Sequence, residues 1–230
     1  MPSAVQKRLD RIQCLAISAW HLEFLIRNTW GHQVAHLQRL ELTVGYAGCD
    51  SFIFGLLTRK RFPMLRSLHW PGTDFGFNGR FPSAFMNFIP LQYLCLGISC
   101  ESHWVDIVRA CATTLKGLEI RGYVDMDRIG STIPPYNIVL PVLQSLHLNY
   151  DLDWRSRVRH YPFRIVTPAL TCIEMGSQQN TKTTPFAVHT SQVTHLRLHG
   201  FYIPDHYPAL KVLPIHQGNS PCLQRSTETK

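Results

Sequence analysis

A short pattern of apolar residues, L-x-x-L-x-L, returns at regular intervals along the chain. Its clearest copy holds Leu143, Leu146 and Leu148, and the first residues of the copies stand at positions 12, 37, 65, 91, 115, 143, 170, 193 and 210. Neighbouring copies are therefore 25, 28, 26, 24, 28, 27, 23 and 17 residues apart. All intervals but the last fall within the ~20–29-residue period of repeat proteins whose units each contribute one strand. Because such units pack mainly on their neighbours, the pattern predicts a solenoid.

The pattern also predicts the direction of the side chains. Successive side chains of a strand alternate between the two faces of a sheet. Positions 1, 4 and 6 of each copy, which are apolar, should therefore form the core, and positions 3, 5 and 7 should form the opposite face. Consecutive strands should pair in parallel, because each connection has to cross back over the body. A strand occupies ~4.8 Å of the stack and a connecting helix ~10 Å, so the sheet should curve with its strands on the inside.

The segments between the copies are less regular. Trp104, Ile107, Val108 and Cys111 share one face at helical spacing and predict the clearest connecting helix. Residues 122–140 contain glycine and prolines and predict a long irregular connection.

The fold class that we predict is therefore α/β. It is a leucine-rich-repeat solenoid with a curved parallel β-sheet on the concave face, and with helices and irregular loops on the convex face. About eight to nine irregular repeats should fill residues 12–216, after a lead-in of residues 1–11 and before a disordered tail of residues 217–230.

Composition and cysteine usage indicate the cellular setting. Hydrophobic residues make up 45% of the chain and charged residues 17%, which is typical of a folded protein. We find neither an apolar run of ~18 residues nor a secretory signal, so no membrane association is expected. The seven cysteines are odd in number and none stands in a C-x-x-C motif. They predict reduced thiols in a cytoplasmic or nuclear protein.

The net charge of +8 is spread evenly along the chain. Residues 1–115 hold 11 Lys/Arg and 7 Asp/Glu, and residues 116–230 hold 12 and 8, so each half carries +4. This distribution lacks the basic block of a nucleic-acid-binding tail, and nucleic acid is not the expected partner. The densest basic segment, Arg155, Arg157, Arg159 and Arg164, lies among aromatic residues and provides the alternative: a basic module that contacts nucleic acid.

The predicted concave face is the candidate protein-binding surface. The alternative reading is a sheet face that is simply solvated, and the sequence leaves both open. Most residues at positions 3, 5 and 7 are polar, and the candidate binding residues among them are Arg39, Glu41, His69, Tyr93, Glu119, Arg121, His147, Asn149, Glu174, His195, Arg197 and His199.

Catalytic and metal chemistry find no support in the sequence. No G-x-S-x-G, P-loop or G-x-G-x-x-G motif is present, so we expect a non-catalytic protein without a cofactor. His147, His195 and His199 could approach one another, but positions two repeats apart are separated by ~10 Å. Because metal ligands must lie within ~2.0–2.3 Å of the ion, no metal site is expected there.

The repeat also carries a family resemblance. The motif Pro-x-Leu-x-x-Leu-x-Leu stands at 141–148, and its proline and first apolar residue recur at 63/65, 168/170 and 208/210. Over roughly residues 10–216 the chain resembles the leucine-rich-repeat region of F-box proteins, particularly the divergent F-box families of fungi. The asparagine common at the ninth position of the repeat is absent, and no F-box is visible in the 11 residues before the first copy.

The resemblance implies a substrate receptor of a cullin-type ubiquitin ligase, whose bound protein is a ubiquitylation target. Docking to the ligase adaptor would require an F-box upstream. Two further possibilities stay open: the chain is a fragment of such a receptor, or a relic that has kept no partner.

Overall fold

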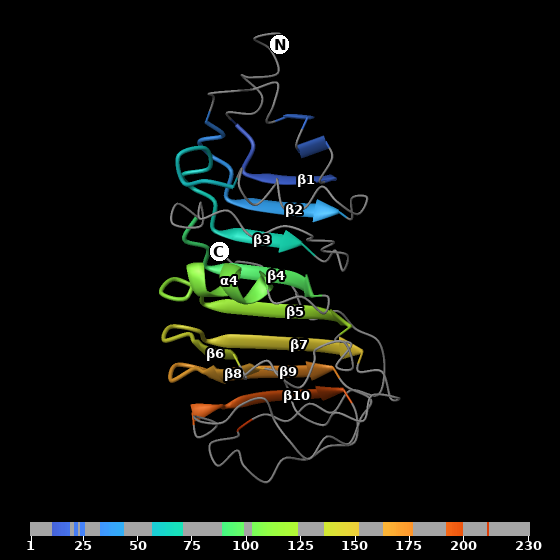
Figure 1. Ribbon diagram of the computed structural model, residues 1–230, viewed down its shortest axis with the longest axis vertical. Helices are drawn as coiled ribbons and strands as arrows, with labels where there is room; N and C mark the ends of the chain where they lie inside the picture. The colour runs from blue at the N-terminus through green and yellow to red at the C-terminus, as the bar shows by residue number, and fades with distance from the viewer. Residues whose placement is uncertain are drawn as a thin grey trace, which may run out of the picture.

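The computed structural model describes residues 11–18, 21–22, 24–25, 33–43, 57–70, 89–98, 103–123, 136–151, 163–176, 192–199 and 211. Its main feature is an eight-stranded sheet whose strands are stacked along the longest axis of the molecule (Figure 1). The strand order is β1-β2-β3-β4-β5-β7-β9-β10, and every neighbouring pair is parallel. The predicted solenoid with a parallel sheet is therefore confirmed.

Each strand of this sheet coincides with one copy of the repeat. The strands are β1 (Cys14–Ser18), β2 (Arg39–Thr43), β3 (Ser67–Trp70), β4 (Tyr93–Ile98), β5 (Gly117–Tyr123), β7 (Ser145–Asp151), β9 (Cys172–Gly176) and β10 (His195–His199). The register is constant across the sheet, because equivalent positions of the copies pair with one another: Leu118 pairs with Leu94 on one side and with Leu146 on the other. A constant register aligns each repeat position in a row that crosses the whole sheet.

The apolar positions of the repeat form one continuous core. Positions 4 and 6 point to the same side of the sheet, and Leu40, Trp70, Leu94, Ile120 and Leu146 are examples that are almost completely buried. The first position of each of the first eight copies joins the same cluster from the turn before its strand. Burying apolar area is the main favourable term in folding, and here it requires neighbouring repeats to be in contact.

Main-chain hydrogen bonds join the repeats where the strands begin. The carbonyl of Gln13, at position 2 of the first copy, accepts the N–H groups of Gln38 and Arg39 from the second. The same pair of bonds recurs at each step of the sheet. It also extends beyond β10, since the Lys211 N–H donates to the Thr194 carbonyl at 2.9 Å. Lys211 stands at position 2 of the ninth copy, so this copy begins in register with the other eight.

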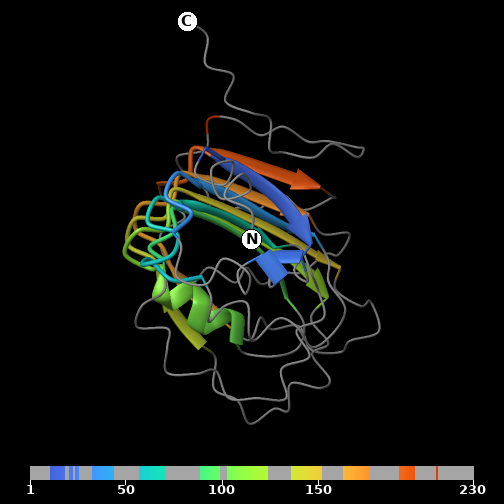
Figure 2. The same cartoon turned by 90° about the horizontal axis from the view of Figure 1, so that it is seen from above.

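A second layer packs on the apolar side of the sheet (Figure 2). It contains α4 (His103–Ala110) and the parallel strand pair β6 (Tyr136–Val139) and β8 (Phe163–Val166). The helix lies where the spacing predicts one, and its Ile107 and Val108 belong to the core. The strand β6 lies inside residues 122–140, which the sequence predicts to be irregular. That prediction is wrong at this point because buried Ile138 pairs with buried Ile165 of β8.

Several other predicted segments lie outside the described residues. They include the tail of residues 217–230, most of the lead-in and most of the loops after the strands. None of the helices in the described part of the chain has the length and apolar character needed to cross a membrane.

Candidate binding face

The side of the sheet opposite the core carries the side chains of positions 3, 5 and 7, and we call it the polar face. The fold brings all the candidate residues of the sequence analysis onto strands of this sheet. Asn149 in β7 and His199 in β10 have described main chains, while their side chains lie outside the description. The constant register places the position-5 residues in one row: Ala16, Glu41, His69, Cys95, Glu119, His147, Glu174 and Arg197.

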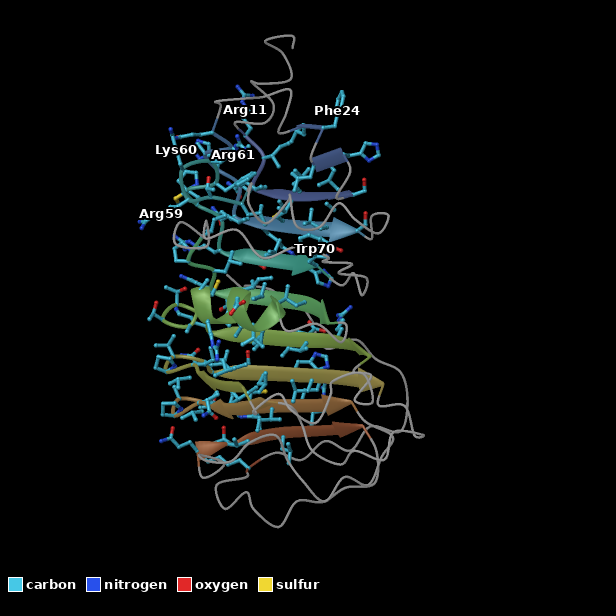
Figure 3. All side chains as sticks on the ribbon, in the orientation of Figure 1. Arg11, Phe24, Arg59, Lys60, Arg61 and Trp70 are labelled. Carbon is cyan, nitrogen blue, oxygen red and sulfur yellow. The ribbon has the colours of Figure 1, made fainter. Side chains whose placement is uncertain are left out.

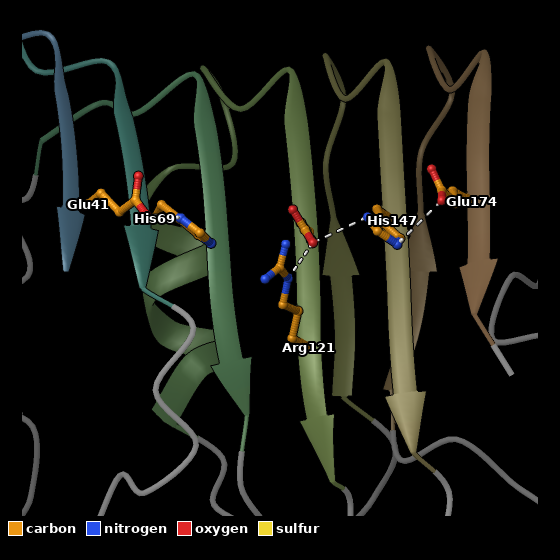
Figure 4. Close-up of polar contacts among 6 residues, drawn as sticks. Glu41, His69, Arg121, His147 and Glu174 are labelled. Carbon is orange, nitrogen blue, oxygen red and sulfur yellow. Dashed lines mark hydrogen bonds and ion pairs between the residues drawn. The ribbon is translucent and has the colours of Figure 1, made fainter. Parts of the chain in front are cut away.

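A chain of ion pairs runs along the C-terminal half of this row (Figure 4). The Glu119 carboxylate accepts a hydrogen bond from Nε of Arg121, two residues further along β5, at 2.5 Å. Nδ1 of His147 lies 3.3 Å from Oε1 of the same carboxylate, and its Nε2 lies 3.8 Å from Oε1 of Glu174. Arg197 completes the chain, with Nη1 3.8 Å from Oε2 of Glu174. His147 therefore sits between two carboxylates, each of which also has an arginine partner.

Glu119 is the most tightly held charge of the face. Only 7% of the residue is exposed. Burial acts to raise the pKa of its carboxyl, but hydrogen bonds from His147 and Arg121 outweigh that effect and lower the pKa from 4.5 to about 2. The same pairing raises the pKa of Arg121 against the opposing effect of its own burial. The Glu119 and Arg121 side chains are thus held in place, and both are charged at neutral pH.

A second, more exposed group occupies the N-terminal half of the row. Nη2 of Arg39 lies 3.7 Å from Oε2 of Glu41, and Nδ1 of His69 lies 3.6 Å from Oε1. The Glu41 side chain is 38% exposed, so solvent weakens these pairs. Burial lowers the pKa of His69, and the nearby charge of Arg121 also acts to lower it. Its Nε2 atom is buried and has no hydrogen-bond partner among the residues that the structure describes.

Glu41, His69 and Cys95 stand on three neighbouring strands in the order acid, imidazole, thiol. This order is that of cysteine nucleophiles activated by a histidine. The chemistry of Cys95 does not fit that role: the residue is buried, and burial together with the neighbouring Glu119 raises the pKa of its thiol well above the usual range. A reactive cysteine requires a lowered pKa. Cys95 is therefore a packing residue of the face.

An aromatic side chain lies beside the charged row. The Tyr93 residue is 50% exposed, and its ring lies against the main chain of Gly117 on the next strand. A Cβ atom at position 117 would stand 2.8 Å from Cδ1 of this ring, so only glycine leaves the ring its place. The polar face therefore presents a fixed aromatic surface near the ion pairs.

The remaining candidate residues are placed as follows. His195 contacts the hydroxyl of Thr194 through Nδ1 at 2.8 Å. Among the residues that the structure describes, no group of three His, Cys, Asp or Glu side chains is placed to hold a metal ion. The basic segment proposed as the alternative lies mostly outside the described residues. Only Arg164 among its four arginines is described, as part of β8, and nothing is described of its side chain.

Sequence reasoning did not identify two features of the face. One is the partnership within single strands, Arg39 with Glu41 and Glu119 with Arg121. Its signal was the i, i+2 spacing, which puts both side chains on one face of a strand. The other is the contact of Tyr93 with Gly117, for which a glycine at a polar-face position of the repeat was the available sign.

No family model, curated protein or solved structure matches the chain. The geometry of the polar face is therefore the ground for inferring its function.

Proposed function

We propose that the chain is a leucine-rich-repeat solenoid that binds a protein through its polar face, without catalysis. The observation that supports this most is the ordered row from Glu119 through His147 to Glu174. On a face that only meets water, long charged side chains are exposed and mobile. Here two carboxylates are almost completely buried and held by arginine and histidine partners. Side chains fixed before binding lose little entropy when a partner docks, and ordered charges favour one partner over others.

The half-exposed Tyr93 supports the same proposal. Tyrosine and arginine are enriched in protein interfaces, since each combines a large contact area with hydrogen-bonding capacity. Tyr93 offers this area on the strand next to the one that carries Glu119 and Arg121. By its resemblance to F-box repeat regions, we further propose that the bound protein is a ubiquitylation target. The chain would then be the recognition part of a ligase receptor.

The test uses a photo-crosslinking amino acid, p-benzoylphenylalanine, in place of Tyr93. The matched control places it at Val139, an apolar residue of the outer layer that is 55% exposed. The expected result is a defined protein adduct from position 93 and none from 139. The adduct should fall at least about tenfold when His147→Ala removes the residue between the two carboxylates, a loss of ~1.4 kcal/mol. Equal adducts from both positions, or adducts indifferent to His147→Ala, would contradict protein binding at this face.

The receptor role has its own readout. If the bound protein is a ubiquitylation target, it should carry ubiquitin in cells that express the wild-type chain and lose it in cells that express His147→Ala. If the ubiquitin content of the crosslinked partner does not change, the receptor role is refuted, while the proposed protein binding still stands.

A further inference from the structure

The edge of the sheet where the strands begin is basic and contains no described acidic residue. We call it the amino edge and define it as residues 11–13, 33–38, 57–66, 89–92, 111–116, 140–144, 167–171, 192–194 and 211. Within these segments the sequence has no Asp or Glu. Its Lys and Arg residues are Arg11, Arg59, Lys60, Arg61 and Arg66, at the first three repeats, and Lys116 and Lys211 further along.

The five cations at the first three repeats are gathered in one region although the sequence separates Arg11 from the other four. Main-chain hydrogen bonds link Gln13 to Gln38 and Gln38 to Arg66, so the turns before β1, β2 and β3 are adjacent. The Val34 N–H also donates to the Arg61 carbonyl at 2.9 Å. Figure 3 shows Arg11, Arg59, Lys60 and Arg61 gathered beside the starts of these strands.

The cations are also available to a ligand. All seven are exposed except Arg61, which is half-buried. In the described part of the chain none of them takes part in an ion pair, whereas each acidic residue of the position-5 row has a basic partner. Like charges grouped without counter-charges repel one another and weaken the fold slightly, and a bound polyanion removes that repulsion.

We propose that the amino edge binds the sugar–phosphate backbone of a double-stranded nucleic acid. A basic stripe on one side of a domain with a pI of about 9.3 is the electrostatic footprint of such proteins. The even distribution of charge along the sequence does not argue against it, because a solenoid collects equivalent turns of all its repeats on one edge.

Two observations favour a duplex over other polyanions. A single strand is held by stacking its bases on exposed aromatic rings, but the only Phe, Tyr or Trp in the described amino edge is the buried Phe62. An acidic protein segment, or a membrane, would need a continuous apolar contact area. The large exposed hydrophobic residues of this edge, Met64 and Val142, precede β3 and β7, which are three strand spacings or ~14 Å apart.

The test measures binding of the full chain to a fluorescent duplex of mixed sequence and about 20 base pairs, at 50–200 mM salt. If the five cations at the first three repeats each contact a phosphate, affinity should fall roughly 500-fold over this range, since the slope is about −0.9 per contact. The variant Arg59→Ala/Lys60→Ala/Arg66→Ala removes three exposed contacts. Its affinity should fall only about 12-fold over the same range, by the same relation.

The matched control is Arg155→Ala/Arg157→Ala/Arg159→Ala, which removes the same charge from the segment that the sequence offered as the alternative. It should bind as the wild type does. Equal loss in both variants would overturn the proposal, as would tighter binding of the single strand, of an oligoglutamate of equal charge, or of vesicles containing phosphatidylserine. Circular dichroism melts verify that both variants fold. Should the triple variant be unfolded, Arg59→Gln/Lys60→Gln replaces it, with an expected slope smaller by about 1.8.

Discussion

The ring of Tyr93 occupies the space that a side chain at position 117 would need. Gly117 is the first residue of β5 and is buried, and a Cβ atom there would also stand 3.1 Å from Oγ of Ser145. Glycine in a strand is normally a weakness, because it packs nothing and loses more chain entropy on folding. At this position it allows an aromatic ring from the neighbouring repeat to lie against the main chain of the sheet.

This contact predicts a coupling between the two positions. Gly117→Ala should be less favourable in the wild type than in a Tyr93→Ala background, by about 1 kcal/mol, because only the wild type has a ring to displace. Urea unfolding of the four proteins measures the coupling. An identical effect of Gly117→Ala in both backgrounds would show that the ring moves aside without cost.

Two of the three carboxylates in the position-5 row, Glu119 and Glu41, should differ in their contribution to stability. Glu119→Gln removes the charge from a buried group that Arg121 and His147 hold, and we expect a loss of about 2–4 kcal/mol in the free energy of unfolding. Glu41→Gln is the matched control. Its pairs are exposed to solvent, so the loss should stay below about 1 kcal/mol. Similar losses of unfolding free energy in both variants would show that the Glu119 carboxylate is no better shielded from solvent than that of Glu41.

Stability should fall in acid because of Glu119. Its pKa is lowered from 4.5 to about 2 in the folded protein, so the unfolded chain binds more protons between these values. The contribution is complete above about pH 5, disappears as the pH falls toward 2, and has an upper limit of about 3 kcal/mol. Unfolding measured from pH 6 to 2 should show this slope, and Glu119→Gln should flatten it. An unchanged slope in Glu119→Gln would assign the acid sensitivity to other groups.

The cysteines should react in an order set by burial. Cys14 is exposed, whereas burial raises the pKa of the Cys111 thiol to about 12 and that of Cys95 further. Since the thiolate is the reacting form, iodoacetamide at pH 8 should label Cys14 quickly and leave Cys95 and Cys111 unmodified until the chain unfolds. Peptide mass spectrometry follows each site. Rapid labelling of Cys95 in the folded protein would instead show an accessible thiolate beside His69.

The core positions of the middle repeats should contribute strongly to the stability of the whole stack. Leu146 is buried in the centre of the sheet, so Leu146→Ala should cost about 2–5 kcal/mol, and Leu146→Asp should unfold the middle of the stack. Gln144→Ala, an exposed change two residues earlier, should cost less than about 0.5 kcal/mol. A circular dichroism melt of Leu146→Asp that matches the wild type would refute the central place of β7.

Short-range patterns in the sequence predicted the strands. The alternation of side chains along each strand then predicted most residues of the polar face. The period of the leucines located all eight strands of the sheet and their register, because a shift of one residue would turn the whole apolar set toward solvent. The outer strands β6 and β8 were not predicted. Each has four residues, and each is stabilised by pairing with the other rather than by a periodicity of its own.

The sequence by itself determined the solenoid, the parallel sheet and the residues that share its polar face, since these follow from the alternation of side chains and the repeat length. Only the tertiary structure decided which side chains touch: His147 between Glu119 and Glu174, Tyr93 over Gly117, and the turns of the first three repeats that bring Arg11, Arg59 and Arg66 to one edge. The physical reason is distance. The periodicity places a residue within its own repeat, whereas contacts such as Glu119 with His147 and Tyr93 with Gly117 join residues of different repeats, which become neighbours only when the repeats stack.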